Sequence, residues 1–291
     1  MPQAKIAVIG GSGLYEIEGL SDIKEVNLDT PFGKPSDTIT IGRLGGVAVA
    51  FLPRHGRSHH ITPTEVPYRA NIYALKALGV EHIIAVNTVG SFREEIKPGN
   101  LVIPDQLIDR TQQRMSTFFG SGIVVHIPFA EPFCPVLRDI LYQAAEDTGT
   151  NIHPRGTYVA MEGPAFSTQA ESRLYRSWGA DIIGMTALPE AKLAREAEIC
   201  YAIIAGVTDY DSWQEKSRLF TVDTIFDTLR QNTAIIKRII KLAVTRIPEE
   251  RNCDCATALK DAIATTRKFI PQEQKRKLDL LIGKYLEKGE S

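Results

Sequence analysis

Two acidic side chains, Asp209 and Asp211, directly follow the apolar run 203–207. Such a run is typical of a buried strand, and in open α/β sheets ligands collect at the carboxyl ends of the strands. Two carboxyl groups there could exchange protons with a substrate or accept its hydrogen bonds. The alternative is an ordinary turn, because aspartate side chains accept hydrogen bonds from nearby backbone amides. The spacing alone leaves both interpretations open.

Hydrogen-bond donors follow two strand-like segments near the start of the chain. The glycine-rich segment 10–13 would let backbone amides and the Ser12 hydroxyl approach a phosphate closely. It lacks the third glycine of a dinucleotide-binding fingerprint, so we do not expect a Rossmann cofactor. After the second segment, Arg54 and His55 could form an anion pocket, because guanidinium groups match phosphate geometry.

The histidines of this second loop allow two other interpretations. His55, His59 and His60 could ligate a metal, but no carboxylate stands at ligand spacing, so we expect no metal there. The loop could also be a solvated basic turn.

Three further segments place polar or aromatic groups after strands. Asn87, Thr88 and Thr186 offer amide and hydroxyl donors beside glycines, and Phe166 follows a Gly-Pro turn. The phenylalanine could stack on a flat base, or it could belong to the core. Together with the two carboxyl groups, these donors predict a cleft with a phosphate at one end and an acid at the other.

Alternating strand-like and helix-like segments must position these groups. This alternation predicts one α/β domain over residues 1–248, with a mixed central sheet flanked by helices. Gly45 and Gly46 suit a hairpin turn. The predicted strands are 5–9, 38–41, 47–51, 82–86, 101–103, 158–161, 181–184 and 199–207. The predicted helices are 67–78, 135–148, 169–177, 188–197 and 222–244.

Residues 249–291 differ in character, being charged and helical in pattern over 256–269 and 272–286. We expect a helical C-terminal appendage that packs on the domain or on a neighbouring subunit.

Composition excludes some partners. The formal net charge of −1 comes without a polybasic stripe, so nucleic acid is not expected as a partner. No signal-type segment begins the chain and no apolar run reaches the roughly 20 residues that cross a bilayer, so we expect a cytoplasmic protein without membrane contact.

The four cysteines are too few for a disulfide framework. Cys253 and Cys255 are spaced too closely for an ordinary zinc knuckle, and the sequence has no matching second pair. We therefore expect exposed thiols and no structural metal, with a redox-active or strained vicinal disulfide as the alternative. Cys134 and Cys200 could meet in space.

In chain order, seven motifs resemble the 5′-methylthioadenosine phosphorylases, members of the trimeric nucleoside phosphorylases. The resemblance covers about residues 6–244 and leaves the C-terminal appendage outside it. The motifs are Gly10–Leu14, Thr30–Asp37, Pro53–Arg57, His126–Cys134, Glu162–Pro164, Met185–Glu190 and Thr208–Asp211.

This resemblance implies phosphorolysis of S-methyl-5′-thioadenosine to adenine and 5-methylthioribose 1-phosphate, in purine and methionine salvage. Inorganic phosphate is then a co-substrate, with no cofactor and no metal. The alternatives are a phosphorylase for adenosine or methylthioinosine, and a non-catalytic nucleotide-binding relative. The resemblance also implies a homotrimer, with a dimer of trimers as a second possibility.

The resemblance assigns roles residue by residue. Asp209 is the expected acid at N7 of the base, and Asp211 contacts the 6-amino group or orients Asp209. Thr88 stands where many relatives have alanine, which leaves its hydroxyl contact in question. The implied phosphate binders are Ser12, Arg54, His55, Asn87, Thr88 and Thr186. The implied substrate binders are Phe166, Ser167, Met185, Asp209, Tyr210 and Asp211, and the implied methylthio pocket is His59, His126, Val222, Ile225 and Phe226.

Relatives that prefer 6-oxopurines carry glutamate, asparagine and histidine where this chain has Ser167, Asp209 and Val222. Serine can donate to N1 of adenine, which a glutamate carboxylate would repel. Valine cannot bond a 5′-hydroxyl but suits a methylthio group. The three differences favour a 6-aminopurine with an apolar 5′ substituent.

Overall fold

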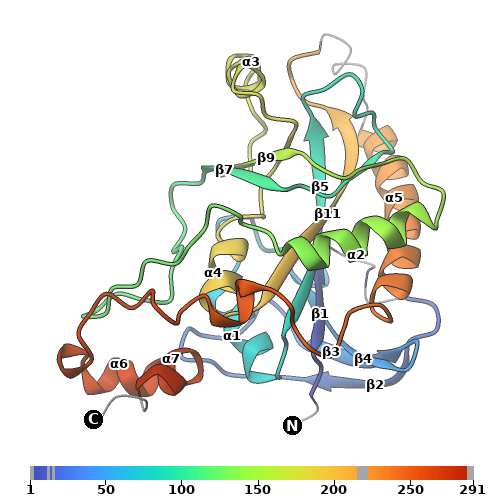
Figure 1. Ribbon diagram of the computed structural model, residues 1–291. Helices are drawn as coiled ribbons and strands as arrows, with labels where there is room; N and C mark the ends of the chain where they lie inside the picture. The colour runs from blue at the N-terminus through green and yellow to red at the C-terminus, as the bar shows by residue number, and fades with distance from the viewer. Residues whose placement is uncertain (1–2, 12–13, 15–16, 215–221, 287–291) are drawn as a thin grey trace.

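A computed structural model describes residues 3–11, 14, 17–214 and 222–286, without the side chains of 222–226 (Figure 1). A twisted sheet runs through the centre, with helices on both of its faces. Most of its central pairings are parallel, while β3 with β4, β10 with β5 and β11 with β6 are antiparallel. The expectation of an α/β domain with a mixed sheet is therefore confirmed.

The strands form one sheet in the order β2-β3-β4-β1-β5-β10-β9-β7, while β11 pairs with β5 and β6, and β6 pairs with β8. They are β1 (Ile6–Gly10), β2 (Ser21–Val26), β3 (Ile39–Leu44), β4 (Val47–Pro53), β5 (His82–Ser91), β6 (Leu101–Val102), β7 (Gln106–Arg110), β8 (Ile152–His153), β9 (Thr157–Met161), β10 (Ile182–Gly184) and β11 (Cys200–Tyr210).

The helices of the domain are α1 (Tyr68–Ala77), α2 (Pro135–Glu146), α3 (Gln169–Ser177), α4 (Glu190–Glu196) and α5 (Val222–Ala243). All five were predicted, with ends shifted by up to two residues. Three strands were missed. β2 is exposed along almost its whole length, β7 has exposed residues at both ends and no fully buried one, and β8 has two residues, so none carries the apolar pattern of a buried strand.

Apolar side chains alternate along the central strands and form a hydrophobic cluster on each face. In β1, Ala7 and Ile9 join the cluster with α1 and α4, whereas Ile6 and Val8 join the one with α2 and α5. A strand buried on both faces reads as a continuous apolar run, which is why the sequence identified these strands. Gly45 and Gly46 both have positive φ, and they close the predicted hairpin between β3 and β4.

The segment after α5 is only partly helical. Residues 256–269 do not form the predicted helix, because the chain makes two short 3-10 turns, Asp254–Thr257 and Arg267–Phe269. The second predicted helix is present but divided into α6 (Gln272–Lys277) and α7 (Asp279–Leu286).

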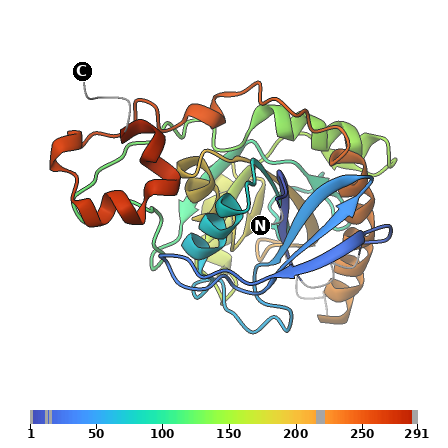
Figure 2. The ribbon, with the colours of Figure 1, turned by 90° about the horizontal axis from the view of Figure 1, so that it is seen from below.

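This segment packs on the domain itself and then projects from it. Leu259, Ile270, Leu278 and Ile282 belong to the same hydrophobic cluster as α1 and α4. Figures 1 and 2 show α6 and α7 extending away from the sheet beside the loop that precedes α2. Within the described residues, every helix is too short or too polar to span a bilayer.

The expectation of exposed thiols is wrong. Cys134, Cys200 and Cys255 are buried and Cys253 is half-buried, because the segment after α5 folds back over the α2 side of the sheet.

Candidate active site

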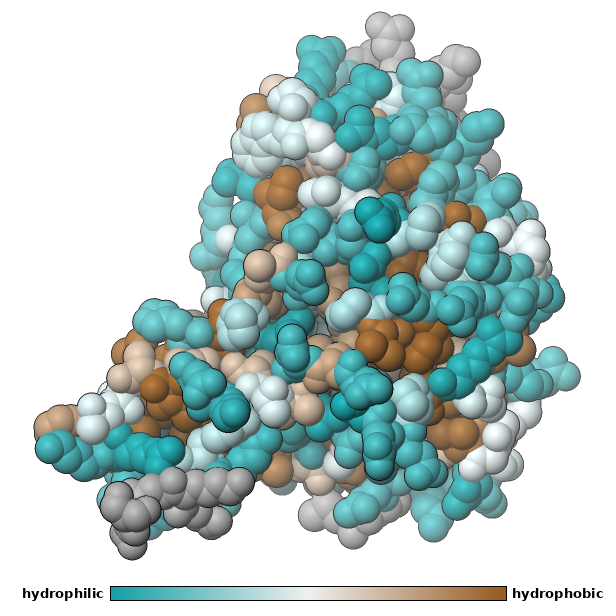
Figure 3. All heavy atoms as spheres, viewed as in Figure 1, coloured by the Kyte–Doolittle hydropathy of each residue, from teal (hydrophilic) through white to brown (hydrophobic). Residues whose placement is uncertain are grey.

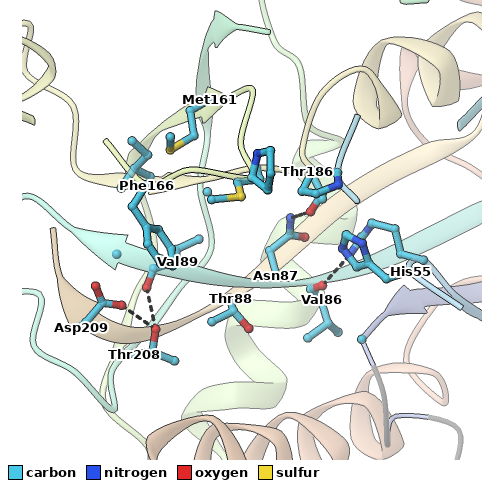
Figure 4. A pocket seen from close by; sticks show the side chains of 18 of the residues that line it. His55, Val86, Asn87, Thr88, Val89, Met161, Phe166, Thr186, Thr208 and Asp209 are labelled. Carbon is cyan, nitrogen blue, oxygen red and sulfur yellow. Dashed lines mark hydrogen bonds between the residues drawn. The ribbon is translucent and has the colours of Figure 1, made fainter. Parts of the chain in front are cut away.

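A cavity of about 390 Å³ lies where the central strands end. The parallel strands β1, β4, β5 and β11 bring their carboxyl ends to one edge of the sheet, and the segments after β9 and β10 close the opposite wall. Figure 4 shows the side chains that point into it. The predicted residues that line it are Arg54, His55, His59, Asn87, Thr88, Phe166, Met185, Thr186, Asp209 and Asp211.

A β-bulge aims the acidic residues into this cavity. β11 stays in register with β5 up to Val207, then skips one residue, so that Asp209 pairs with Gly90. The extra residue, Thr208, lets two consecutive side chains face the cavity, which the alternation of a regular strand would forbid. Asp209 therefore lies within a strand, and the turn interpretation is wrong for it.

The environment of Asp209 moves the pKa of its carboxyl toward neutral pH. Burial raises the pKa of this carboxyl to about 6, and the negative charge of Asp211 adds to the rise, while a hydrogen bond from Thr208 opposes it. The Thr208 hydroxyl donates to Asp209 Oδ1 over 2.7 Å (Figure 4). A carboxyl group held this way can donate a proton to a substrate atom at physiological pH.

Arg54 is the buried cation at the other end of the cavity. Its Nε and Nη2 atoms donate to the two carboxylate oxygens of Glu190 over 2.8 Å each, and Nη1 donates to the Val86 carbonyl over 3.0 Å. The Tyr201 hydroxyl holds the same carboxylate at 2.9 Å. Burial alone would lower the pKa of Arg54, but Glu190 more than offsets it and the pKa ends above its usual value. Glu190 was not among the predicted site residues, although it stands in one of the seven motifs.

His55 stands beside Arg54 as a neutral ring. Burial, then the Arg54 charge, lower the pKa of His55 to about 4. Its Nδ1 lies 2.8 Å from the Ile61 carbonyl and therefore carries the proton, which leaves Nε2 as an acceptor. An imidazole in this state can bond a protonated phosphate oxygen.

Asn87 and Thr186 form a hydrogen-bonded pair on the cavity wall. The Asn87 amide donates to Thr186 Oγ1 over 2.9 Å (Figure 4), so the hydroxyl proton of Thr186 is left for a ligand oxygen. Thr88 follows Asn87 on β5, so its side chain lies on the other face of that strand. It is exposed and also lines the cavity. These donors and Arg54 together make an anion-binding corner.

The base side of the cavity differs from expectation in two residues. Phe166 is 79% exposed, so it is not a core residue and its ring is available to a ligand. Ser167 donates its hydroxyl to the Asp211 carboxylate over 2.8 Å and does not line the cavity. Tyr210 also points away, with its hydroxyl donating to the Glu94 carbonyl over 3.1 Å. Ser167 therefore orients the Asp211 carboxylate. The Ser167 hydroxyl could donate to a base only if this hydrogen bond broke.

Arg114 stabilises the wall that carries Met185, and it was not among the predicted site residues. The guanidinium donates to the carbonyls of Met185 and Leu188 over 2.5 and 2.7 Å and bonds the Glu162 carboxylate over 3.2 Å. Its side chain is 1% exposed. A lone arginine in a polar loop is not recognisable from sequence, because its partners come from segments 46 and more residues away.

The remaining predicted residues are not in the cavity as described. Ser12 and the side chains of Val222, Ile225 and Phe226 lie outside the described residues. His126 is described, but it stands on the projecting loop, where its amide donates to the Ala262 carbonyl over 2.8 Å.

Comparisons with known proteins agree with this geometry. Residues 5–244 match the Phosphorylase superfamily. An S-methyl-5′-thioadenosine phosphorylase of Geobacter sulfurreducens is 59% identical over 97% of this chain and 99% of its own length. One from Thermofilum pendens is 51% identical over 90% of this chain and all of its own length. The family match ends at residue 244, as expected, but the 97% coverage by the Geobacter relative takes in most of residues 249–291, so likeness to individual phosphorylases extends into the appendage.

Solved structures give the same result. A methylthioadenosine phosphorylase from an Antarctic soil metagenomic library has a TM-score of 0.93 and 49% identity, and covers 97% of this chain and 99% of its own. An N87T mutant of the adenosine/methylthioadenosine phosphorylase of Schistosoma mansoni, in complex with adenine, has a TM-score of 0.85 and 37% identity and covers 91% of this chain and all of its own. The family resemblance is confirmed, and the chain belongs to the phosphorylase superfamily.

Proposed function

We propose that this protein catalyses the reversible phosphorolysis of S-methyl-5′-thioadenosine. The observation that carries the proposal is one cavity with a buried carboxyl of raised pKa, Asp209, at one end and an anion-binding corner around Arg54 at the other. The names of the Geobacter and metagenomic relatives support this substrate.

The geometry supports a division of labour between the two ends. Phosphate attacks the anomeric carbon as the glycosidic bond to N9 breaks, and the electron pair of that bond moves into the purine. Asp209 donates its proton to N7, so adenine leaves as a neutral base. Arg54 and the donors of Asn87, Thr88 and Thr186 hold phosphate against the developing positive charge of the ribosyl centre.

The direct test of this function is release of adenine from S-methyl-5′-thioadenosine with and without phosphate. We expect release that depends on phosphate, because the nucleophile must occupy the Arg54 corner. Adenosine and methylthioinosine are the matched comparisons, and slower turnover is expected with both. Equal release without phosphate would indicate a hydrolase, and no release would indicate a binding protein.

The working enzyme is proposed to be a homotrimer. The loop that carries His126 pairs with the C-terminal segment through a Val125–Ile263 bridge, and the two project from the domain together. Phe269, in the C-terminal segment, is 70% exposed, and Figure 3 shows hydrophobic atoms on this projection. Such surfaces mark subunit contacts, and His126 would then reach a neighbour's cavity. Sedimentation at assay concentration should give a trimer, and an active monomer would overturn this assembly.

A further inference from the structure

Four cysteines meet at the end of the sheet opposite the active site. They come from three separate segments: Cys134 precedes α2, Cys200 begins β11, and Cys253 and Cys255 follow α5. All four Sγ atoms lie within 4.8 Å of one another, and the Cys200–Cys253 pair is separated by 3.4 Å. The chain has no second close pair of cysteines to match 253 and 255, but folding brings Cys134 and Cys200 beside them.

The distances fit a metal ion at the centre of the four sulfur atoms. Zinc bonds thiolate sulfur at about 2.3 Å with tetrahedral geometry, which places the sulfur atoms about 3.8 Å apart. A disulfide joins its sulfur atoms at about 2.05 Å. The observed sulfur–sulfur separations lie on both sides of the tetrahedral value. Small rotations of the side chains would therefore bring all four sulfur atoms to bonding distance from one ion.

The surroundings can stabilise the charge of such a site. Four thiolates around a divalent ion carry a net charge of about −2, and Cys134 stands at the amino end of α2, where the helix dipole is positive. Arg251 lies two residues before Cys253, and its Nη1 donates to the Glu198 carbonyl over 2.6 Å, which keeps it on this face. Its Nε also lies 3.8 Å from the Glu81 carboxylate, so this cation is already paired and the helix dipole is the main favourable field.

A buried histidine provides a second, independent observation. His82 is the β5 residue in register with Cys200 on the adjacent parallel strand, so both side chains point to the same face. Its Nδ1 atom is buried and has no hydrogen-bond partner within the part of the chain that the structure describes. Residues around metal sites commonly donate a ring N–H to a ligand atom, and a thiolate would give this nitrogen the partner it lacks.

We infer that Cys134, Cys200, Cys253 and Cys255 bind one zinc ion per chain as a structural tetrathiolate site. Soft thiolates in tetrahedral geometry select zinc over the harder divalent ions. Half-buried Cys253 gives the ion a way in. The site fastens the start of the C-terminal segment to α2 and β11, and Figures 1 and 2 show that segment beside the amino end of α2.

The first experiment uses the whole, unmodified enzyme. Purified without chelator and dialysed against zinc, it should contain about one zinc per chain by mass spectrometry of the metal, and cobalt loading should give the thiolate-to-metal charge-transfer band of a tetrahedral site. Thiol titration after denaturation in chelator should find four free thiols. Less than about 0.1 metal ion per chain, or an intact mass with two disulfides, would overturn the inference.

The second experiment compares Cys253→Ser with Asp254→Ser, a control at the exposed residue between the two cysteines. Chelator should lower the Tm of the wild type and of the control, and leave that of Cys253→Ser unchanged, since only that variant lacks a ligand. Phosphorolysis at low temperature should persist in both, because Cys200 and Asp209 lie roughly 30 Å apart along β11. Equal zinc content in the two variants would overturn the assignment of Cys253.

Discussion

Replacing Asp209 by asparagine should lower kcat on S-methyl-5′-thioadenosine by about 100-fold to 10,000-fold, the usual contribution of a general acid. Asparagine keeps the size of the side chain and can accept the Thr208 hydrogen bond, but it has no acidic proton for N7. The measurement is steady-state phosphorolysis, followed as adenine release, together with phosphate binding by calorimetry. Phosphate affinity should change little, because the anion-binding corner does not include this residue.

The control for this variant is Asp261→Asn, the same chemical change at an exposed position. It should retain wild-type kcat. Near-normal turnover by Asp209→Asn would remove the carboxyl from the reaction.

The pH profile of the wild type tests the same proton. The acid form of Asp209 is the active one, and burial raises its pKa to about 6, so kcat/KM for the nucleoside at low phosphate should fall as pH rises above about 6. Bound phosphate dianion raises this pKa further, so the falling limb should move to higher pH as phosphate saturates. If the pH of the falling limb does not change with phosphate concentration, the titrating group is not Asp209.

Replacing Glu190 by glutamine should lower the free energy of unfolding by about 3 to 5 kcal/mol, because it removes one partner of a fully buried ion pair. Arg54 and Glu190 are 2% and 0% exposed, and the glutamine can accept only one of the two guanidinium hydrogen bonds. The measurement is denaturant unfolding without ligand. Glu273→Gln, at an exposed position, is the matched control and should unfold like the wild type.

Phosphate should partly restore the stability of Glu190→Gln. With its carboxylate partner gone, Arg54 keeps an uncompensated charge that an anion in the corner can offset, so the rise in Tm on adding phosphate should be larger in the variant than in the wild type. An equal rise in both proteins would mean that Arg54 does not face the bound anion.

Local sequence patterns were sufficient for most of the sheet and for the site's position. Apolar runs such as 82–86 are buried on both faces of a parallel sheet, so their composition alone identifies them. The appendage was predicted less well. Residues 256–269 alternate charged and apolar residues at helical spacing, yet Leu259 and Ile270 pack against the domain from the turn and the bend that follow two short 3-10 helices. Tertiary contacts there override a weak helical preference.

The sequence by itself determined the family, the α/β sheet, and the grouping of Arg54, Asn87, Thr186 and Asp209 at the strand ends, because ordered motifs and apolar runs are local properties. Tertiary structure alone decided which atoms those groups can use. The bulge at Thr208 turns Asp209 inward, Glu190 occupies two donors of Arg54, and Asp211 takes the Ser167 hydroxyl. The tertiary structure also brings together four cysteines that are far apart in the sequence. Each of these contacts joins segments far apart in the chain, and spacing along a sequence carries no information about such distances.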